Sequence, residues 1–132
     1  MWRHQTVTIL TGGNSLTRKI VFLVWIISIG TVCVLSLLPK VYTPVSFWNS
    51  DKVYHCLWYA WLSGLPALAF REARAGFKAG LAMFFLGVVL ECLQFFIPGR
   101  FFSIADIAAN GVGVLVGARI GKVISTKTAK RK

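Results

Sequence analysis

The sequence predicts an all-α integral membrane protein, a bundle of four transmembrane helices with both termini in the cytoplasm. Three observations lead to this prediction. Hydrophobic residues make up 56% of the 132 residues and charged residues only 14%, well below the roughly one quarter that is usual in a soluble domain. The mean hydropathy is +0.68. Long uncharged stretches also alternate with short basic segments.

The first predicted span covers residues 20–38, a stretch without a charged side chain that is long enough to cross a hydrocarbon core of about 30 Å. Its apolar core is longer than that of a secretory signal and no small-x-small cleavage site follows, so we expect it to be retained. Residues 1–19 are predicted to form a cytoplasmic tail. The second span covers residues 53–70, whose ionisable groups are one histidine, one cysteine and two tyrosines.

The third and fourth spans are predicted over residues 77–97 and 104–120. Glu91 interrupts the third span, and the fourth is short enough that Arg119 must reach the interface through its long side chain. Residues 121–132 would then form a basic cytoplasmic tail. Four spans in a chain of this length leave room for short loops only, so we expect one bundle without a soluble domain.

The basic residues predict which end of each helix faces the cytoplasm. Of the 15 lysine and arginine residues, only Lys40, Lys52 and Arg100 fall on the outer side of the predicted topology. This bias places both termini in the cytoplasm. The formal net charge of +11 is therefore an orientation signal, and we expect no nucleic-acid partner.

Small residues within the spans are expected to have a packing role. The three cysteines show no spacing typical of a metal site, and we expect them to pack as small apolar side chains. Glycines at every fourth position across residues 113–121 predict a close approach between the fourth helix and a neighbour.

The last three predicted helices each carry one stripe of polar residues, which recur at intervals of three or four positions. The stripes are Asp51, His55 and Tyr59; Glu91 and Gln94; and Ser103, Asp106 and Asn110. Because lipid offers no hydrogen-bond partner, such stripes must face protein or a water-filled cavity. A rise of about 1.5 Å per residue puts the three stripes at matching depths in the outer half of the membrane. With Lys52 and Arg100 at its rim, the predicted site is a polar, partly basic pocket that opens to the outside.

Structural roles for the same residues stay open at this point. Gln94 and Asn110 are equally typical of hydrogen bonds between helices. An ion pair between Asp106 and Arg100 would hold the turn between the third and fourth spans. Glu91 is harder to explain by structure alone, because an intramembrane carboxylate costs about 2.5–3.5 kcal/mol on insertion scales and glutamine or leucine would avoid that cost. The sequence leaves open whether Glu91 is protonated.

Three segments carry a resemblance to a known family. They read "DKVYHCLWYAWL" from Asp51, "GVVLECLQFFIPGR" from Gly87 and "SIADIAANGVGVLVG" from Ser103. Together they resemble the signature of the VanZ-like family of small bacterial membrane proteins, over residues from about 51 to 117. The resemblance implies a multi-pass protein of the bacterial cytoplasmic membrane with a role in the cell envelope, and a family association with glycopeptide-antibiotic resistance. It implies no particular reaction.

Three classes of function fit these residues. In the first, Lys52, His55 and Arg100 hold the phosphate or carboxylate of an anionic envelope lipid or lipid-linked glycan. In the second, the protein is a membrane-embedded enzyme in which Glu91, His55 and Asp106 supply acid and base groups for phosphoryl or glycosyl transfer. In the third, the polar residues only hold the bundle or an assembly together. We favour the first, with membrane lipids as the partners. A proton-coupled transporter is disfavoured, because the inner halves of the spans lack matching polar groups.

The polar residues also bear on metals and cofactors. Oxygen and imidazole donors that suit several divalent ions are supplied by Asp51, His55, Glu91 and Asp106. Their spacing specifies no ion, so the sequence assigns no metal site. It leaves any cofactor and the oligomeric state open.

Overall fold

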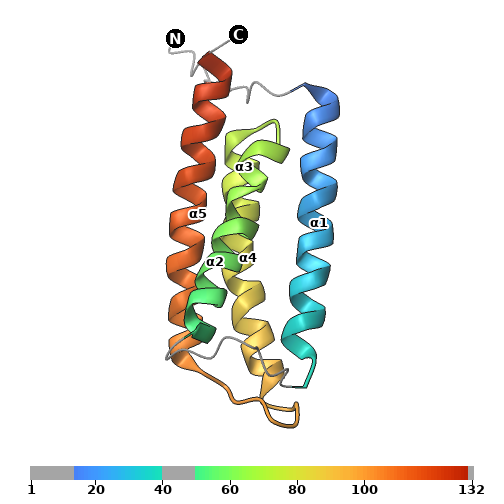
Figure 1. Cartoon of the computed structure of the whole chain (residues 1–132). Helices are drawn as coiled ribbons and strands as arrows, with labels where there is room; N and C mark the ends of the chain where they lie inside the picture. Colours follow the sequence, from blue (N-terminus) through green and yellow to red (C-terminus); the bar gives the residue numbers. More distant parts are fainter. Residues whose placement is uncertain (1–13, 40–49, 131–132) are drawn as a thin grey trace, which may run out of the picture.

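The computed structural model describes residues 14–39 and 50–130, and these residues fold into helices without a β-strand. The four longer helices run roughly along one common axis (Figure 1). In chain order the helices are α1 (Ser15–Leu37), α2 (Ser50–Gly64), α3 (Pro66–Ala69), α4 (Ala73–Gln94) and α5 (Ile104–Lys130). The prediction of an all-α fold is confirmed. Lys40 and most of the predicted N-terminal tail lie outside the described residues.

Three of these helices, α1, α4 and α5, are long and apolar enough to cross a membrane. The predicted second span, residues 53–70, is instead divided between α2 and α3. Leu65 at the junction keeps helical dihedral angles, with φ −58° and ψ −41°, but Pro66 then begins α3 and has no N–H to donate to the preceding turn. The uninterrupted second span is therefore corrected to two helical pieces, each shorter than a membrane crossing requires.

The last helix also differs from the prediction at its C-terminal end. α5 continues past residue 120, so the predicted tail over residues 121–132 is helical as far as Lys130. This segment contains no proline that would end the helix. Gly121 and Ser125 are buried, so packing supports the added turns as well.

α2 and α5 form the most extensive helix pairing among the described residues. Glycines of α5 make this pairing possible, because their missing side chains let the backbones meet. A Cβ atom on Gly113 would overlap the carbonyl oxygen of Cys56, and one on Gly117 would overlap that of Ala60. Ser63 Oγ also donates a hydrogen bond of 3.0 Å to the carbonyl oxygen of Val114. The predicted role of these glycines in close packing is confirmed.

α1 is attached to the rest of the bundle by fewer contacts. Of its described residues only Trp25 and Val32 are buried. The Trp25 indole N–H donates a hydrogen bond of 2.8 Å to the carbonyl oxygen of Leu62 in α2. The Trp25 ring also packs edge-on against Phe70, with 5.8 Å between the ring centroids. Trp61 of α2 also donates its indole N–H to Ser28 Oγ at 3.1 Å, so two tryptophan side chains hold the middle of α1.

The two ends of the bundle differ in charge. At one end α1 and α4 stop while α2 and α5 begin, and we call this end the α4–α5 loop end (Figure 1). It carries three of the four acidic residues, Asp51, Glu91 and Asp106. The opposite end carries Glu72 and most of the described basic residues: Arg18, Lys19, Arg71, Arg74, Lys78, Arg119, Lys122 and Lys127.

The close approach of α2 and α5 predicts the effect of adding one methyl group. We expect Gly117→Ala to destabilise the folded protein by about 1–3 kcal/mol, because the new Cβ overlaps backbone that cannot move without separating the helices. Gly30→Ala is the matched control, since no atom lies within 4 Å of the added Cβ and alanine favours the helix. Thermal unfolding in detergent compares the two variants. Unchanged stability of Gly117→Ala would contradict the close backbone contact.

Candidate functional site

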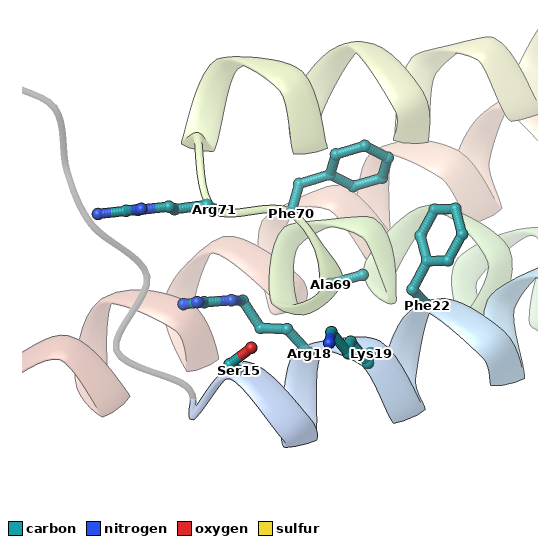
Figure 2. A pocket seen from close by; sticks show the side chains of 7 residues that line it. All are labelled: Ser15, Arg18, Lys19, Phe22, Ala69, Phe70 and Arg71. Atoms are coloured by element: carbon teal, nitrogen blue, oxygen red, sulfur yellow. The ribbon is translucent and has the colours of Figure 1, made fainter.

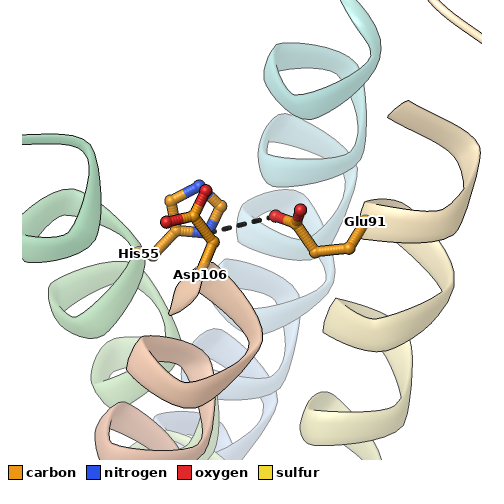
Figure 3. Close-up of side chains that lie close together, drawn as sticks. All are labelled: His55, Glu91 and Asp106. Carbon is orange, nitrogen blue, oxygen red and sulfur yellow. Dashed lines mark ion pairs between the residues drawn. The ribbon is translucent and has the colours of Figure 1, made fainter. Parts of the chain in front are cut away.

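Three helices bring acid and base side chains together at the α4–α5 loop end. His55 comes from α2, Glu91 from α4 and Asp106 from α5, and their side chains point toward one another (Figure 3). One ring nitrogen and one oxygen from each carboxylate lie within 4.8 Å of one another. His55 Nδ1 is 3.8 Å from Glu91 Oε1, an ion pair when the imidazole is protonated. We call these three residues the acid–base cluster.

Asn110 of α5 lies next to the acid–base cluster and contacts His55. Its side-chain oxygen lies 2.9 Å from His55 Nδ1. An amide oxygen can only accept, so Nδ1 carries the proton in this contact and a neutral imidazole keeps its lone pair on Nε2. Asn110 is only 1% exposed, and it therefore holds the ring of His55 in one orientation.

Gly87, one turn before Glu91 on α4, makes room for this arrangement. A Cβ atom at Gly87 would lie 2.8 Å from Asn110 Nδ2 and 2.8 Å from Tyr59 Cε1. Tyr59 is 2% exposed and forms the floor of the site beside Asn110. Gly87 is the residue that the sequence interpretation missed. Its spacing of four positions before Glu91, on the same helix face, is the signal that would have found it.

Two side chains stabilise the N-terminal end of α5: Ser103, which precedes the helix, and Glu91 of α4. Ser103 precedes the helix, and its Oγ accepts a hydrogen bond of 3.2 Å from the Asp106 N–H. In a capping box the side chain at the position of Asp106 would accept the Ser103 N–H. Here Glu91 Oε2 accepts it at 3.3 Å, from another helix. The Asp106 carboxylate is thereby left for other interactions.

Two buried polar atoms of the site have no hydrogen-bond partner among the described residues. They are Asp106 Oδ1 and Asn110 Nδ2. A buried polar group left unpaired costs about 1–3 kcal/mol. Glu91, at 1% exposure, adds the cost of a carboxyl group placed among apolar helices. Packing alone gives no reason to keep these groups, and we therefore take this arrangement as the candidate functional site.

Gln94 and Arg100 contact α1 instead of the acid–base cluster. Gln94 Nε2 donates to the Ser36 carbonyl oxygen at 3.1 Å. Arg100 donates from Nε to the Leu38 carbonyl oxygen at 3.1 Å and from Nη2 to that of Leu35 at 3.0 Å. These carbonyl groups at the end of α1 have no partner within the helix, and a cation is favourable there. Both side chains therefore fasten the last turn of α1.

The ion pair between Arg100 and Asp106, which the sequence left open as a structural alternative, does not form among the described residues. Gly99 precedes Arg100 in the loop between α4 and α5, and its φ of 79° lies in the left-handed region that favours glycine. The two remaining predicted residues lie at the mouth of the site. Asp51 is exposed and Lys52 half-buried in the first turn of α2, and neither joins the acid–base cluster.

Two surface cavities lie away from the acid–base cluster. The first, of about 370 Å³, is at the opposite end between α1 and the segment after α3 (Figure 2). Its lining residues are Ser15, Arg18, Lys19, Phe22, Ala69, Phe70 and Arg71. The second, of about 290 Å³, has mainly apolar walls from α2, α3 and α5. Neither of these two cavities is the polar pocket predicted from the sequence.

The comparisons with known proteins give one match. The family model described as VanZ/LLP1 matches residues 17–125, a range that includes every residue of the acid–base cluster and Asn110. None of the curated proteins and none of the solved structures matches the chain.

The contacts of Arg100 predict a stabilising role. We expect Arg100→Ala to lower the free energy of unfolding by about 1–3 kcal/mol, because two charge-assisted hydrogen bonds to α1 are lost. Arg100→Lys keeps the charge without the fork of donors, so its stability should lie between the two. Thermal unfolding in detergent is the measurement, with the exposed Arg119→Ala as the control. A melting temperature for Arg100→Ala equal to that of the control would contradict the stabilising role of the contacts between Arg100 and α1.

Proposed function

The chain belongs to the VanZ/LLP1 family, and from this premise we propose that its polar site binds the headgroup of an anionic envelope lipid or lipid-linked glycan. The protein is a membrane protein of the VanZ type. The finer proposal is that it is a multi-pass protein of the bacterial cytoplasmic membrane, and that lipid handling underlies a role in the cell envelope, including glycopeptide resistance.

The charges of the two ends support an orientation. Basic side chains gather at the end where α1 begins and α5 ends, and positive residues favour the cytoplasmic side. In the proposed arrangement α1, α4 and α5 each cross the membrane, and α2 with α3 forms the remaining crossing. Both termini are then cytoplasmic. The α4–α5 loop end, with the acid–base cluster, faces outward.

One observation carries the proposal of a lipid ligand: the buried polar groups of the site lie close in the chain to strongly exposed apolar side chains. Glu91 and Asn110 are each 1% exposed, whereas Phe101 is 82% and Ile104 75% exposed on the segment that leads into α5. Aromatic side chains are typical of the membrane interface. A ligand that fits both surfaces has a polar head and an apolar tail, as a membrane lipid has.

The mouth of the site supplies positive charge for an anionic head. Lys52 lies on α2 three positions before His55, on the same side of the helix. The Arg100 guanidinium has more donors than the two that α1 takes up. Both groups suit a phosphate.

A second candidate is an enzyme, and the acid–base cluster itself favours it. His55, Glu91 and Asp106 bring acid and base side chains from three helices together as one group. Their types and separations suit proton transfer during phosphoryl or glycosyl transfer. Binding of the lipid would then be the first step of that reaction, so the binding test applies to both candidates.

The proposed orientation predicts which cysteine labels react from outside. In a variant without Cys33, Cys56 and Cys92, we expect a cysteine at Phe101 to react with a membrane-impermeant maleimide in intact cells. A cysteine at Lys127 should react only after permeabilisation, because the end of α5 is cytoplasmic in this topology. Labelling of Lys127→Cys in intact cells would overturn the orientation and the outward-facing site.

The lipid proposal predicts the lipid content of the purified protein. We expect the double variant Lys52→Ala, His55→Gln to carry about tenfold less co-purified anionic lipid than the parent, because the charge-assisted contact of Lys52 and the imidazole of His55 are lost. Lys78→Ala, an exposed lysine at the opposite end, is the control and should keep its lipid. Native mass spectrometry measures both. Unchanged lipid content in the double variant would contradict the lipid proposal and favour a purely structural role for the polar residues.

A further inference from the structure

The acid–base cluster has the composition of a metal-binding site. One imidazole nitrogen and two carboxylate oxygens, each from a different helix, lie within 4.8 Å of one another. Mixed nitrogen and oxygen donors suit divalent ions such as Zn²⁺ and Mn²⁺. We propose that His55, Glu91 and Asp106 bind one divalent transition-metal ion. This inference goes beyond lipid binding and stands without it.

The separations require only small side-chain movements for three bonds to one ion. Bonds from zinc to nitrogen or oxygen are about 2.0–2.2 Å long, so donors that share a tetrahedral ion lie about 3.5 Å apart. In the structure the three donor atoms lie within 4.8 Å of one another. Rotation of the carboxylates about their side-chain bonds would shorten these separations without a change in the helices. Three protein ligands leave coordination positions open for water or for an anionic group.

Asn110 is an independent observation that points to the same ligand. Its side chain is 1% exposed and directed at the acid–base cluster, with the amide oxygen 2.9 Å from His55 Nδ1. A histidine that binds a metal through one nitrogen usually donates its other N–H to such an oxygen. The amide nitrogen of Asn110 has no partner among the described residues.

Each of the two carboxylates has one oxygen that could bind a metal ion. Glu91 Oε2 accepts the Ser103 N–H, which orients the group and leaves Oε1 on the side of His55. Asp106 Oδ1 is buried and accepts no hydrogen bond from a described residue. Two ionised carboxylates this close repel each other strongly among apolar helices, and a divalent cation removes that repulsion.

The type of ion follows from the imidazole. Mg²⁺ and Ca²⁺ favour oxygen ligands, whereas Zn²⁺ and Mn²⁺ accept imidazole together with carboxylate. An ion bound here joins α2, α4 and α5 at the α4–α5 loop end. It also presents positive charge beside the mouth of the site, where a phosphate of a lipid headgroup would arrive.

The test uses the full chain in detergent, treated with a chelator that is then removed. Titration calorimetry with Zn²⁺ is expected to give one ion per chain. Asp106→Asn and Glu91→Gln keep the shape of each side chain, and each should weaken binding by about tenfold or more, as loss of a ligand does. Glu72→Gln is the matched control, because Glu72 is exposed at the far end of α4. It should bind as the parent does.

A spectroscopic measurement identifies the histidine. Electron spin echo spectra of the Mn²⁺-loaded protein should contain a coupling to imidazole nitrogen, and His55→Gln should lose it. Absence of stoichiometric Zn²⁺ binding, or equal binding by Asp106→Asn and the Glu72→Gln control, would overturn the metal site. If Glu91→Gln does not fold, Asp106→Asn and the spectrum decide. If the metal-free protein retains its lipid, failure of the metal proposal leaves the lipid proposal unaffected.

Discussion

Glu91 carries a carboxyl group into a bundle whose helices are otherwise joined mainly by apolar and small side chains. Such a group must find its partners on other helices, since lipid and apolar side chains provide none. Glu91 finds Ser103 at the start of α5 and His55 on α2. The position where α5 begins and the freedom of the Asp106 carboxylate both depend on this one side chain, whereas Asn110 orients the imidazole. The site is thus a consequence of satisfying one buried acid.

The helices can only meet in this way because their backbones come close. Gly113 and Gly117 let α5 lie directly on α2, and Gly87 leaves space on α4 for Asn110 and Tyr59. Each glycine removes a side chain that would push the polar groups apart. Close packing and polar contact are therefore two aspects of the same arrangement, in which small residues bring donors and acceptors within reach.

α1 takes part in a different way. It contributes no side chain to the acid–base cluster and is held by two tryptophan side chains in its middle and by Gln94 and Arg100 at its end. The unpaired carbonyl groups of its last turn are the reason that these two polar residues turn away from the cluster. An arginine beside a polar site is easily interpreted as a ligand for an anion. Here most of its observed contacts are explained by the end of a helix.

The sequence by itself determined the fold class and the helix faces that meet. Apolar stretches of membrane-crossing length indicate α1, α4 and α5, and the spacing of His55, Glu91, Asp106 and Asn110 places each on an inward face, because hydrophobic and polar periodicity follow from helix geometry alone. The division at Pro66 follows from the missing proline N–H, which is a local property, whereas the extension of α5 to Lys130 is supported by the packing of Gly121 and Ser125. Tertiary structure alone decided that Arg100 binds α1, that Glu91 accepts the Ser103 N–H and that Gly87 opens the site. Periodicity specifies the direction in which a side chain points, whereas its partner depends on the register and distance between helices, which are set by contacts between residues far apart in the chain.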